Sequence, residues 1–230
     1  MTRRFAAILG AAAVLAPPAL AADAAHPAVV ELFQSQGCSS CPPANARVMA
    51  LNARPDVLTL SFQVTYWDQL GWKDTFASPR YTARQWDYAR ALRHDNVFTP
   101  QVVINGRTDV VGIQPGEIEQ AMGRADRGAG GPRLTLAAGR LDVSGDRAGR
   151  AADVWLVRYD PRIVQVPIRR GENGGRTLPH QNVVRSLTRL GEWVGGARSY
   201  DLPPPDPGGL KSAILLQAGP GGPILAAARA

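Results

Sequence analysis

The sequence has few of the side chains that bind soft metal ions, since its 230 residues include 2 cysteines, 3 histidines and 3 methionines. A structural zinc site usually takes four cysteine or histidine ligands. His26, His94 and His180 stand far apart and lack the spacing of metal ligands, so a zinc site is not predicted. Copper capture by the two cysteine sulfurs is an alternative, but no methionine-rich or histidine-rich stretch supports it. We therefore predict no metal site.

The sequence also lacks the clustered positive charge of a nucleic-acid-binding protein. Its formal net charge is +7, and the basic residues are nearly all arginine, with Lys73 and Lys211 as the only lysines. There is no run of about five or more basic residues, and no basic stretch is interleaved with aromatic residues. We interpret the basicity as dispersed surface charge and predict no nucleic-acid partner.

Long apolar runs are absent except at the N-terminus, which has the pattern of an export signal. Arg3 and Arg4 precede the apolar, alanine-rich run Phe5–Leu20, and Ala19-Leu20-Ala21 fits a cleavage signal. The run is too short, and too interrupted by proline, for a stable membrane span. We predict a cleaved signal peptide over residues 1–22, no stable membrane span afterwards, and a periplasmic or secreted location where thiols can oxidise.

Both cysteines stand in one stretch, Gly37-Cys38-Ser39-Ser40-Cys41-Pro42-Pro43, between a predicted strand, Val29–Phe33, and a predicted helix, Ala44–Ala53. Cys38 is expected at the exposed start of that helix, where unpaired N–H groups and the helix dipole favour a thiolate. In such motifs the thiol pKa falls from about 8.5 to between about 3.5 and about 7.5. Cys41 lies one turn on, near enough to close a disulfide. We predict that Cys38 is the nucleophile and Cys41 the resolving thiol.

An inert structural disulfide is the main alternative for this pair. A bridge that closes so short a loop constrains the unfolded chain little, so stabilisation alone explains it poorly. Thiol–disulfide exchange needs two thiols at this spacing and no metal or organic cofactor. We therefore favour redox chemistry and predict no cofactor.

Three further stretches have clear secondary-structure patterns. Val57–Val64 is typical of a buried strand, and Tyr81–Leu92 is typical of a helix. Phe98–Gly112 consists of two β-rich runs around Asn105-Gly106, which is a strong signal for a hairpin turn. A further helix is predicted from about Pro115.

Aromatic residues gather between the second strand and the helix that follows it. The segment Tyr66–Phe76, with Trp86 further on, contains three of the five tryptophans. One interpretation is that the rings pack this segment onto the sheet. The other is that some of them, with Trp67 and Trp72 as candidates, line a groove beside Cys38 and bind an extended partner, since large rigid aromatic rings are good recognition anchors.

This order of elements, with its Cys-x-x-Cys and Thr99-Pro100 motifs, resembles the thioredoxin superfamily over about Val29–Arg127. In that superfamily a cis-proline begins the strand that faces the cysteine pair, and Thr99-Pro100 matches its position. The resemblance implies that Thr99 and Pro100 position the backbone of a partner. Together with the export signal, the cysteine pair predicts that the partners are protein thiols or disulfides, or a small thiol, of the cell envelope.

A narrower resemblance rests on three motifs together. They are Gln36–Ala44 around the cysteines, Tyr66–Asp74 with its two tryptophans, and Thr99–Gly106. These motifs resemble the secreted bacterial "domain of unknown function 1223" family. That resemblance implies a secreted protein but no particular reaction.

The second half of the chain has a different pattern, which begins after the glycine-rich stretch 128–132. Short predicted strands alternate with turns, and no helical period is present. The predicted strands are Arg133–Ala137, Leu141–Ser144, Ala152–Tyr159, Ile163–Ile168, Asn182–Leu187, Ala213–Gln217 and Ile224–Ala228. We predict a small antiparallel sandwich. The predicted domains are residues 27–128 and 133–230.

Several polar side chains cluster within this second half, and two interpretations are open for them. They are Glu172, Asn173, Arg176, His180, Asn182 and Arg185. These residues would lie either in hairpin turns and on solvated strand faces, or in a loop that reaches the Cys38 site and shapes it.

The predicted fold class is therefore α/β: a thioredoxin-like domain, with a mixed sheet, flanking helices and a helical insertion, followed by a β-sandwich-like domain. The predicted function is that of an exported thiol–disulfide oxidoreductase acting through Cys38 and Cys41. The alternative is a non-catalytic envelope binding or assembly module that keeps a structural disulfide on the same scaffold, since a fold does not by itself confer activity.

Overall fold

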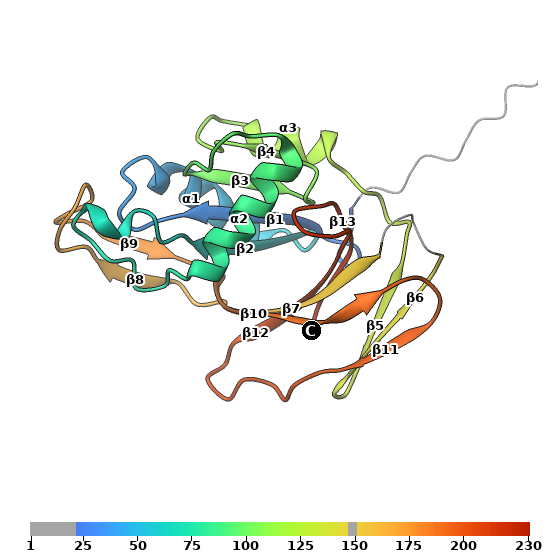
Figure 1. The fold of residues 1–230 in the computed structure, drawn as a ribbon. Helices are drawn as coiled ribbons and strands as arrows, with labels where there is room; N and C mark the ends of the chain where they lie inside the picture. Colours follow the sequence, from blue (N-terminus) through green and yellow to red (C-terminus); the bar gives the residue numbers. More distant parts are fainter. Residues whose placement is uncertain (1–21, 147–150) are drawn as a thin grey trace, which may run out of the picture.

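A mixed sheet of eight strands forms the centre of the molecule in a computed structural model that describes residues 22–146 and 151–230 (Figure 1). The strand order is β13-β12-β7-β10-β2-β1-β3-β4. Together with its few helices, this sheet confirms the α/β class. The predicted signal peptide covers residues 1–22, of which residues 1–21 lie outside the described part of the chain. Among the described residues, no helix is long and apolar enough to cross a membrane.

The first four strands lie at one side of this sheet. They are β1 (Ala28–Gln34), β2 (Val57–Gln63), β3 (Gln101–Ile104) and β4 (Thr108–Val110). β1 pairs in parallel with β2 and antiparallel with β3, and β4 returns from β3 through the predicted hairpin turn. Asn105 in that turn has a φ of 51°, and its side chain accepts a hydrogen bond from the Val29 N–H at 2.8 Å. All residues of β1, β2 and β3 are buried, which explains their near-continuous apolar runs.

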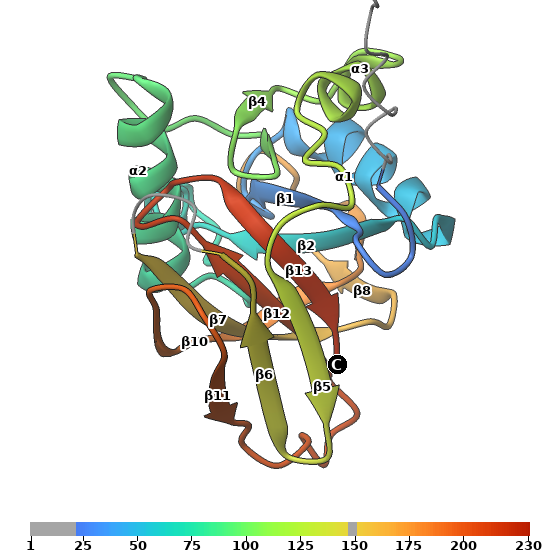
Figure 2. The same cartoon turned by 90° about the vertical axis from the view of Figure 1, so that its right-hand side faces the viewer.

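Three α-helices cover the two faces of these strands. They are α1 (Cys41–Ala50), α2 (Pro79–Leu92) and α3 (Glu117–Arg124), with short 3-10 helices η1 (Leu51–Ala53) and η2 (Asp68–Leu70). α1 and α3 pack on one face of the sheet and α2 on the other (Figure 2). α1 begins at Cys41, before the predicted Ala44. The first-turn N–H groups of a helix have no partner within it, so Pro42 and Pro43 are tolerated there.

The described part of the second half supplies nine more strands, β5 to β13. Four of them extend the large sheet beyond β2: β7 (Ala152–Asp160), β10 (Val183–Trp193), β12 (Lys211–Gln217) and β13 (Ile224–Arg229). A three-stranded sheet is formed by β5 (Arg133–Ala137), β6 (Arg140–Ser144) and β11 (Arg198–Asp201). A hairpin is formed by β8 (Val164–Pro167) and β9 (Thr177–His180). The three-stranded sheet packs on β7, β12 and β13 through an apolar cluster that includes Leu141, Leu156 and Ile214 (Figure 2).

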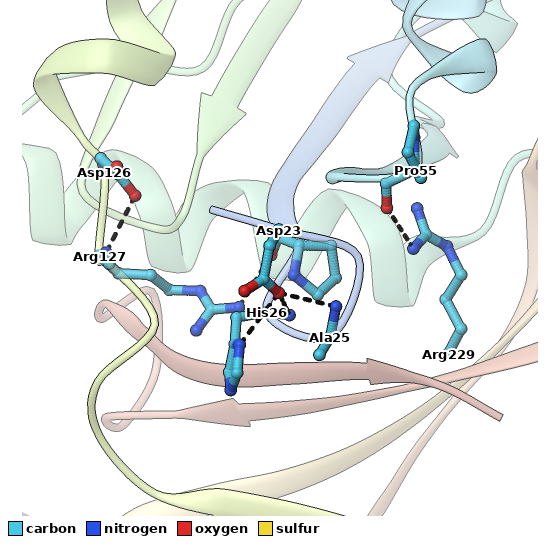
Figure 3. A network of polar contacts seen from close by, with 9 residues as sticks. Asp23, Ala25, His26, Pro55, Asp126, Arg127 and Arg229 are labelled. Atoms are coloured by element: carbon cyan, nitrogen blue, oxygen red, sulfur yellow. Dashed lines mark hydrogen bonds and ion pairs between the residues drawn. The ribbon is translucent and has the colours of Figure 1, made fainter. Parts of the chain in front are cut away.

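The large sheet and its core run across the predicted boundary at residues 128–132. β10 joins β2 in parallel at Val183 and Ser61, and one core cluster contains residues of both halves, such as Phe62 and Leu215. The C-terminal strand is also held to the loop before β2, where the Arg229 guanidinium donates to the Pro55 carbonyl at 2.9 Å (Figure 3). The division into domains 27–128 and 133–230 stays a prediction. Such a boundary would separate strands that belong to the same eight-stranded sheet.

Candidate functional site

Cys38 and Cys41 form a disulfide with an S–S distance of 2.16 Å, in the turn that leads from β1 into α1. The Cys38 N–H donates to the Ser35 carbonyl, and the Cys38 carbonyl accepts from the Cys41 N–H. Cys38 is 0% exposed and Cys41 is 1% exposed. The expectation that Cys38 lies at an exposed helix start was therefore wrong: the helix begins at Cys41, and Cys38 is buried although Ser39 and Ser40 next to it are exposed.

The first segment that packs on this turn is the aromatic stretch before α2. The Asp74 carboxylate accepts a hydrogen bond from the Gln36 N–H at 2.7 Å, and the Trp72 indole donates to the Gln36 side chain at 2.9 Å. Burial raises the pKa of Asp74 to about 6. Trp72 therefore lies beside the turn and helps to fix Gln36, two positions before Cys38, while its role in binding a partner stays a prediction.

The second segment is the loop before β3. The Trp67 indole donates to the Thr99 hydroxyl at 2.7 Å, and the Ser40 hydroxyl donates to the Thr99 carbonyl at 3.5 Å. The same Ser40 hydroxyl lies 3.4 Å from the Cys38 sulfur. The Thr99-Pro100 peptide bond is cis and Pro100 is buried. Trp67 and Thr99 are therefore joined to each other and to the cysteine turn, while their role in binding a partner stays a prediction.

The third segment is the loop between β8 and β9, which belongs to the second half of the chain (Figure 1). The fully buried Asn173 side chain donates to the carbonyls of Gln36 and Cys38, both at 2.9 Å. The Ser39 N–H donates to the Glu172 carboxylate at 3.1 Å. Hydrogen bonds from Ser39 lower the pKa of Glu172. Of the two interpretations of the polar cluster, the one in which a loop reaches the Cys38 site is confirmed for these two residues.

The other members of that polar cluster have different positions. Arg176 donates to the Asn173 side chain at 2.7 Å and so supports it. Asn182 donates to Asn52 and Thr59 at the far end of β2, away from the cysteines. The Arg185 guanidinium lies 4.5 Å from the centre of the Phe76 ring.

The last member, His180, borders a small cavity together with Cys41. The cavity has a volume of about 40 Å³ and is also lined by Gln34, Asn45 and Pro179. The Asn45 side chain accepts from Gln34 and donates to the Pro179 carbonyl, both at 2.8 Å. Burial lowers the pKa of His180 to about 4, so its imidazole is neutral at neutral pH.

A wider pocket of about 500 Å³ lies between α2 and β10 and includes neither cysteine. It is lined by Arg80, Arg84, Trp155 and Arg189 among others. Its one buried charge, Arg84, is paired with Glu31 at 2.7 Å. We take the disulfide as the candidate functional site because Cys38 and Cys41 carry the only sulfur pair of the sequence, and the larger pocket contains neither of them. In the described part of the chain, no three histidine, cysteine or acidic side chains are placed to hold a metal ion together.

The comparison with protein families gives a match over residues 29–217, to the family described as "Protein of unknown function (DUF1223)". The chain belongs to the DUF1223 family. No curated protein matches it. Among solved structures it is similar to the crystal structure of protein AGR_C_4864 from Agrobacterium tumefaciens. The identity is 30%, the match covers 88% of this chain and 92% of that chain, and the TM-score is 0.70.

The DUF1223 match begins in β1 and ends at the last residue of β12. It therefore includes the cysteine turn and all three segments that pack on it, with the β8–β9 loop among them. Sequence reasoning placed Trp67, Trp72, Thr99 and Pro100 near the cysteines but did not assign Asp74 to the site. The only sequence signal for Asn173 was its place in a glycine-rich turn among other polar residues.

Proposed function

We propose that this DUF1223 protein is an exported thiol–disulfide oxidoreductase on a thioredoxin-like scaffold, and that Cys38 and Cys41 are its redox pair. One observation carries the proposal: polar groups of three separate segments, from Asp74, Thr99 and Asn173, converge on a turn whose disulfide joins residues only three apart. So short a ring adds little to stability. The convergence is better explained by a need to hold the sulfurs in one geometry for exchange.

The exchange transfers two electrons in two displacement steps. A partner thiolate attacks the Cys38 sulfur, the Cys38–Cys41 bond breaks, and Cys41 leaves as a thiolate. A second partner thiolate then attacks the partner sulfur of the mixed disulfide and releases Cys38 as a thiolate. The two partner thiols end as a disulfide and the cysteine pair is reduced. The same steps in reverse reduce a partner disulfide to two thiols and re-form the Cys38–Cys41 disulfide.

A partner must reach a sulfur that the folded chain covers. Ser39 and Ser40 are exposed, whereas Cys38 lies beneath them and beside Asn173. We propose that the β8–β9 loop moves aside for a protein partner and that Thr99, Pro100, Trp67 and Trp72 then contact it. A small envelope thiol needs a smaller opening. The signal-peptide pattern supports a periplasmic or secreted location.

The burial of both cysteines supports a second candidate function. A disulfide that is 0% and 1% exposed at its two residues is protected from reductants, as a purely structural bond would be. The protein would then be an envelope binding or assembly module without turnover. The two candidates differ in whether the disulfide exchanges while the chain stays folded.

Turnover assays on the full mature chain, residues 23–230, separate the two candidates. We expect the protein to accelerate the reduction of insulin by dithiothreitol, or of a small mixed disulfide by glutathione. Cys38→Ser should abolish this activity, and Cys41→Ser should accumulate a mixed disulfide through Cys38. Ser39→Ala is the matched control and should stay active. If the mature chain accelerates neither reaction, and its disulfide resists reduction until the chain unfolds, the structural candidate is correct.

A further inference from the structure

The side chain of His180 has no role in the contacts described so far. It is the last residue of β9 and is only 2% exposed. Neither of its ring nitrogens has a hydrogen-bond partner among the described residues. Its closest aromatic neighbour is Phe76, whose ring centre lies 5.9 Å away with the planes at 84°. Such a contact is a weak substitute for a hydrogen bond.

A buried imidazole without partners is unfavourable, because a neutral imidazole carries one N–H donor and one acceptor nitrogen. The other polar side chains around the same cavity are already engaged. Gln34 and Asn45 bond to each other, and the Ser35 hydroxyl accepts from the Gly37 N–H at 3.0 Å. Cys41 is the remaining residue on the cavity wall that can change its bonding.

The Cys41 sulfur is a poor hydrogen-bond acceptor in the disulfide and a strong one as a thiolate. When the S–S bond opens, the two sulfurs must separate to a non-bonded distance, and the cavity beside Cys41 gives its sulfur room to turn. His180 lies on the wall of that cavity. We propose that His180 donates a hydrogen bond to the Cys41 sulfur once the disulfide opens, and so stabilises the reduced pair.

This inference rests on the proposed function and gives His180 a positioning role in it. In the first step the partner thiolate forms a bond to Cys38, and the electron pair of the broken S–S bond stays on Cys41. The neutral imidazole N–H then bonds to that thiolate without giving up its proton. In the reverse direction the same bond orients the Cys41 thiolate as it attacks Cys38 and displaces the partner thiolate.

The unpartnered imidazole makes the effect specific to one redox state. In the oxidised protein neither ring nitrogen of His180 has a hydrogen-bond partner among the described residues, so the imidazole does not stabilise the disulfide form. In the reduced chain it gains a charge-assisted bond, which is among the stronger hydrogen bonds in proteins. His180 should therefore raise the reduction potential of the pair and lower the pKa of the Cys41 thiol.

The test replaces His180 by residues that lack or keep an N–H donor. His180→Phe and His180→Leu lack one, whereas His180→Asn and His180→Gln place an amide N–H near the positions of the two ring nitrogens. We expect each donor-free variant to shift the equilibrium with glutathione about tenfold toward the disulfide, or about 30 mV lower in potential. At least one amide variant should keep a potential close to that of the wild type.

A second measurement needs no turnover. In a Cys38→Ser background, the Cys41 thiol can be titrated by its thiolate absorbance, with and without His180→Phe. We expect the pKa of Cys41 to rise by about one unit when the donor is lost. Circular dichroism and thermal unfolding show which variants are folded, and His180→Leu serves if His180→Phe is not.

The two readouts separate failure of this inference from failure of the proposed function. If the unchanged chain does not exchange with glutathione but His180→Phe still raises the pKa of Cys41, the oxidoreductase proposal fails while the contact stands. If folded donor-free variants leave both the potential and the pKa of Cys41 unchanged, His180 has no bond to that sulfur and the inference is wrong.

Discussion

The molecule has one buried polar cluster at the middle of β1 and another at the turn that follows β1, and the two differ in how completely their groups are hydrogen-bonded. In the first, Arg84 of α2 donates to Glu31, Gln217 and Tyr88 at 2.7, 2.9 and 2.9 Å. Tyr88 also donates to Glu31. These contacts join α2, the centre of β1 and the end of β12.

The second cluster surrounds the disulfide, and two of its groups are poorly suited to burial. His180 has no hydrogen-bond partner in the described chain, and burial raises the pKa of Asp74 to about 6. Native proteins retain such groups mainly where function uses them. In the proposed function, the Arg84 cluster stabilises the fold, whereas the disulfide cluster keeps an unpartnered hydrogen-bonding group for exchange at the sulfurs.

The largest expected effect is the loss of the whole second half of the chain. A fragment of residues 23–128 lacks β7, β10, β12 and β13, so it exposes the β2 edge and the apolar cluster around Phe62. We expect this fragment to be unfolded by circular dichroism. The control is the full chain cleaved in the glycine-rich stretch 128–132, which should stay folded as a two-part complex. A folded, thiol-reactive fragment would instead establish the two predicted domains.

The Arg84 cluster should respond through stability alone. Arg84→Met leaves the Glu31 carboxylate buried without its cation, which typically costs about 3–5 kcal/mol of unfolding free energy. Urea unfolding measures this loss, and the reduction potential of the disulfide should not change. Arg140→Met, at an exposed pair with Asp142, is the control and should have no measurable effect. A shift in potential with Arg84→Met would mean that the two clusters are coupled.

The disulfide cluster should respond to pH through Asp74. Its pKa in the folded chain is about 6, above the usual 3.8, so between these values the folded chain binds more protons than the unfolded chain. The free energy of unfolding therefore falls as pH rises through this window. Compared with Asp74→Asn, the wild type should lose on the order of 2 kcal/mol between about pH 4 and pH 6, with a small further loss up to about pH 7 and none beyond.

Urea unfolding of both proteins at a series of pH values gives this difference. Acidic residues with lowered pKa, such as Asp160, act in the opposite direction but are present in both proteins, so they cancel. If the difference in unfolding free energy between wild type and Asp74→Asn stays constant from pH 4 to pH 6, the pKa of Asp74 is not raised and burial does not disfavour its charged form.

The smallest effect on stability is expected at the β8–β9 loop, where a substitution should instead change the rate at which the disulfide is reduced. Asn173→Ala removes the donors to the Gln36 and Cys38 carbonyls and should cost about 1 kcal/mol. Reduction of the disulfide by excess dithiothreitol should become several-fold faster, because the loop no longer holds the turn. Glu172→Gln, at an exposed contact, should change the rate little. Equal rates for Asn173→Ala and wild type would show that the loop does not limit access.

Local patterns predicted the first half of the chain well. The β1 and β2 runs, the Asn105-Gly106 turn and the Cys38–Cys41 pair all depend on residues that are close in sequence. The start of α1 was missed: the helix was predicted to begin at Ala44, after the two prolines, but it begins at Cys41. β9 was missed because Pro179 lies inside it; proline is tolerated there since β9 pairs on one side only, with β8.

Contacts between distant residues could not be predicted from the sequence. The pairing of Val183 with Ser61 joins two halves that have different patterns, and nothing local specifies it. The cover over Cys38 depends on Asn173, which is 135 residues away along the chain. The exposure of a cysteine in a Cys-x-x-Cys motif is therefore a tertiary property, even where the motif itself is evident in the sequence.

The reduction potential of the Cys38–Cys41 pair tests the central claim most directly. The mature chain would be equilibrated with glutathione or dithiothreitol buffers of known potential, and its thiols would be trapped and counted. The account predicts a value above about −300 mV, within the range of pairs that exchange in cells. A value well below about −300 mV would identify a structural disulfide and contradict the account.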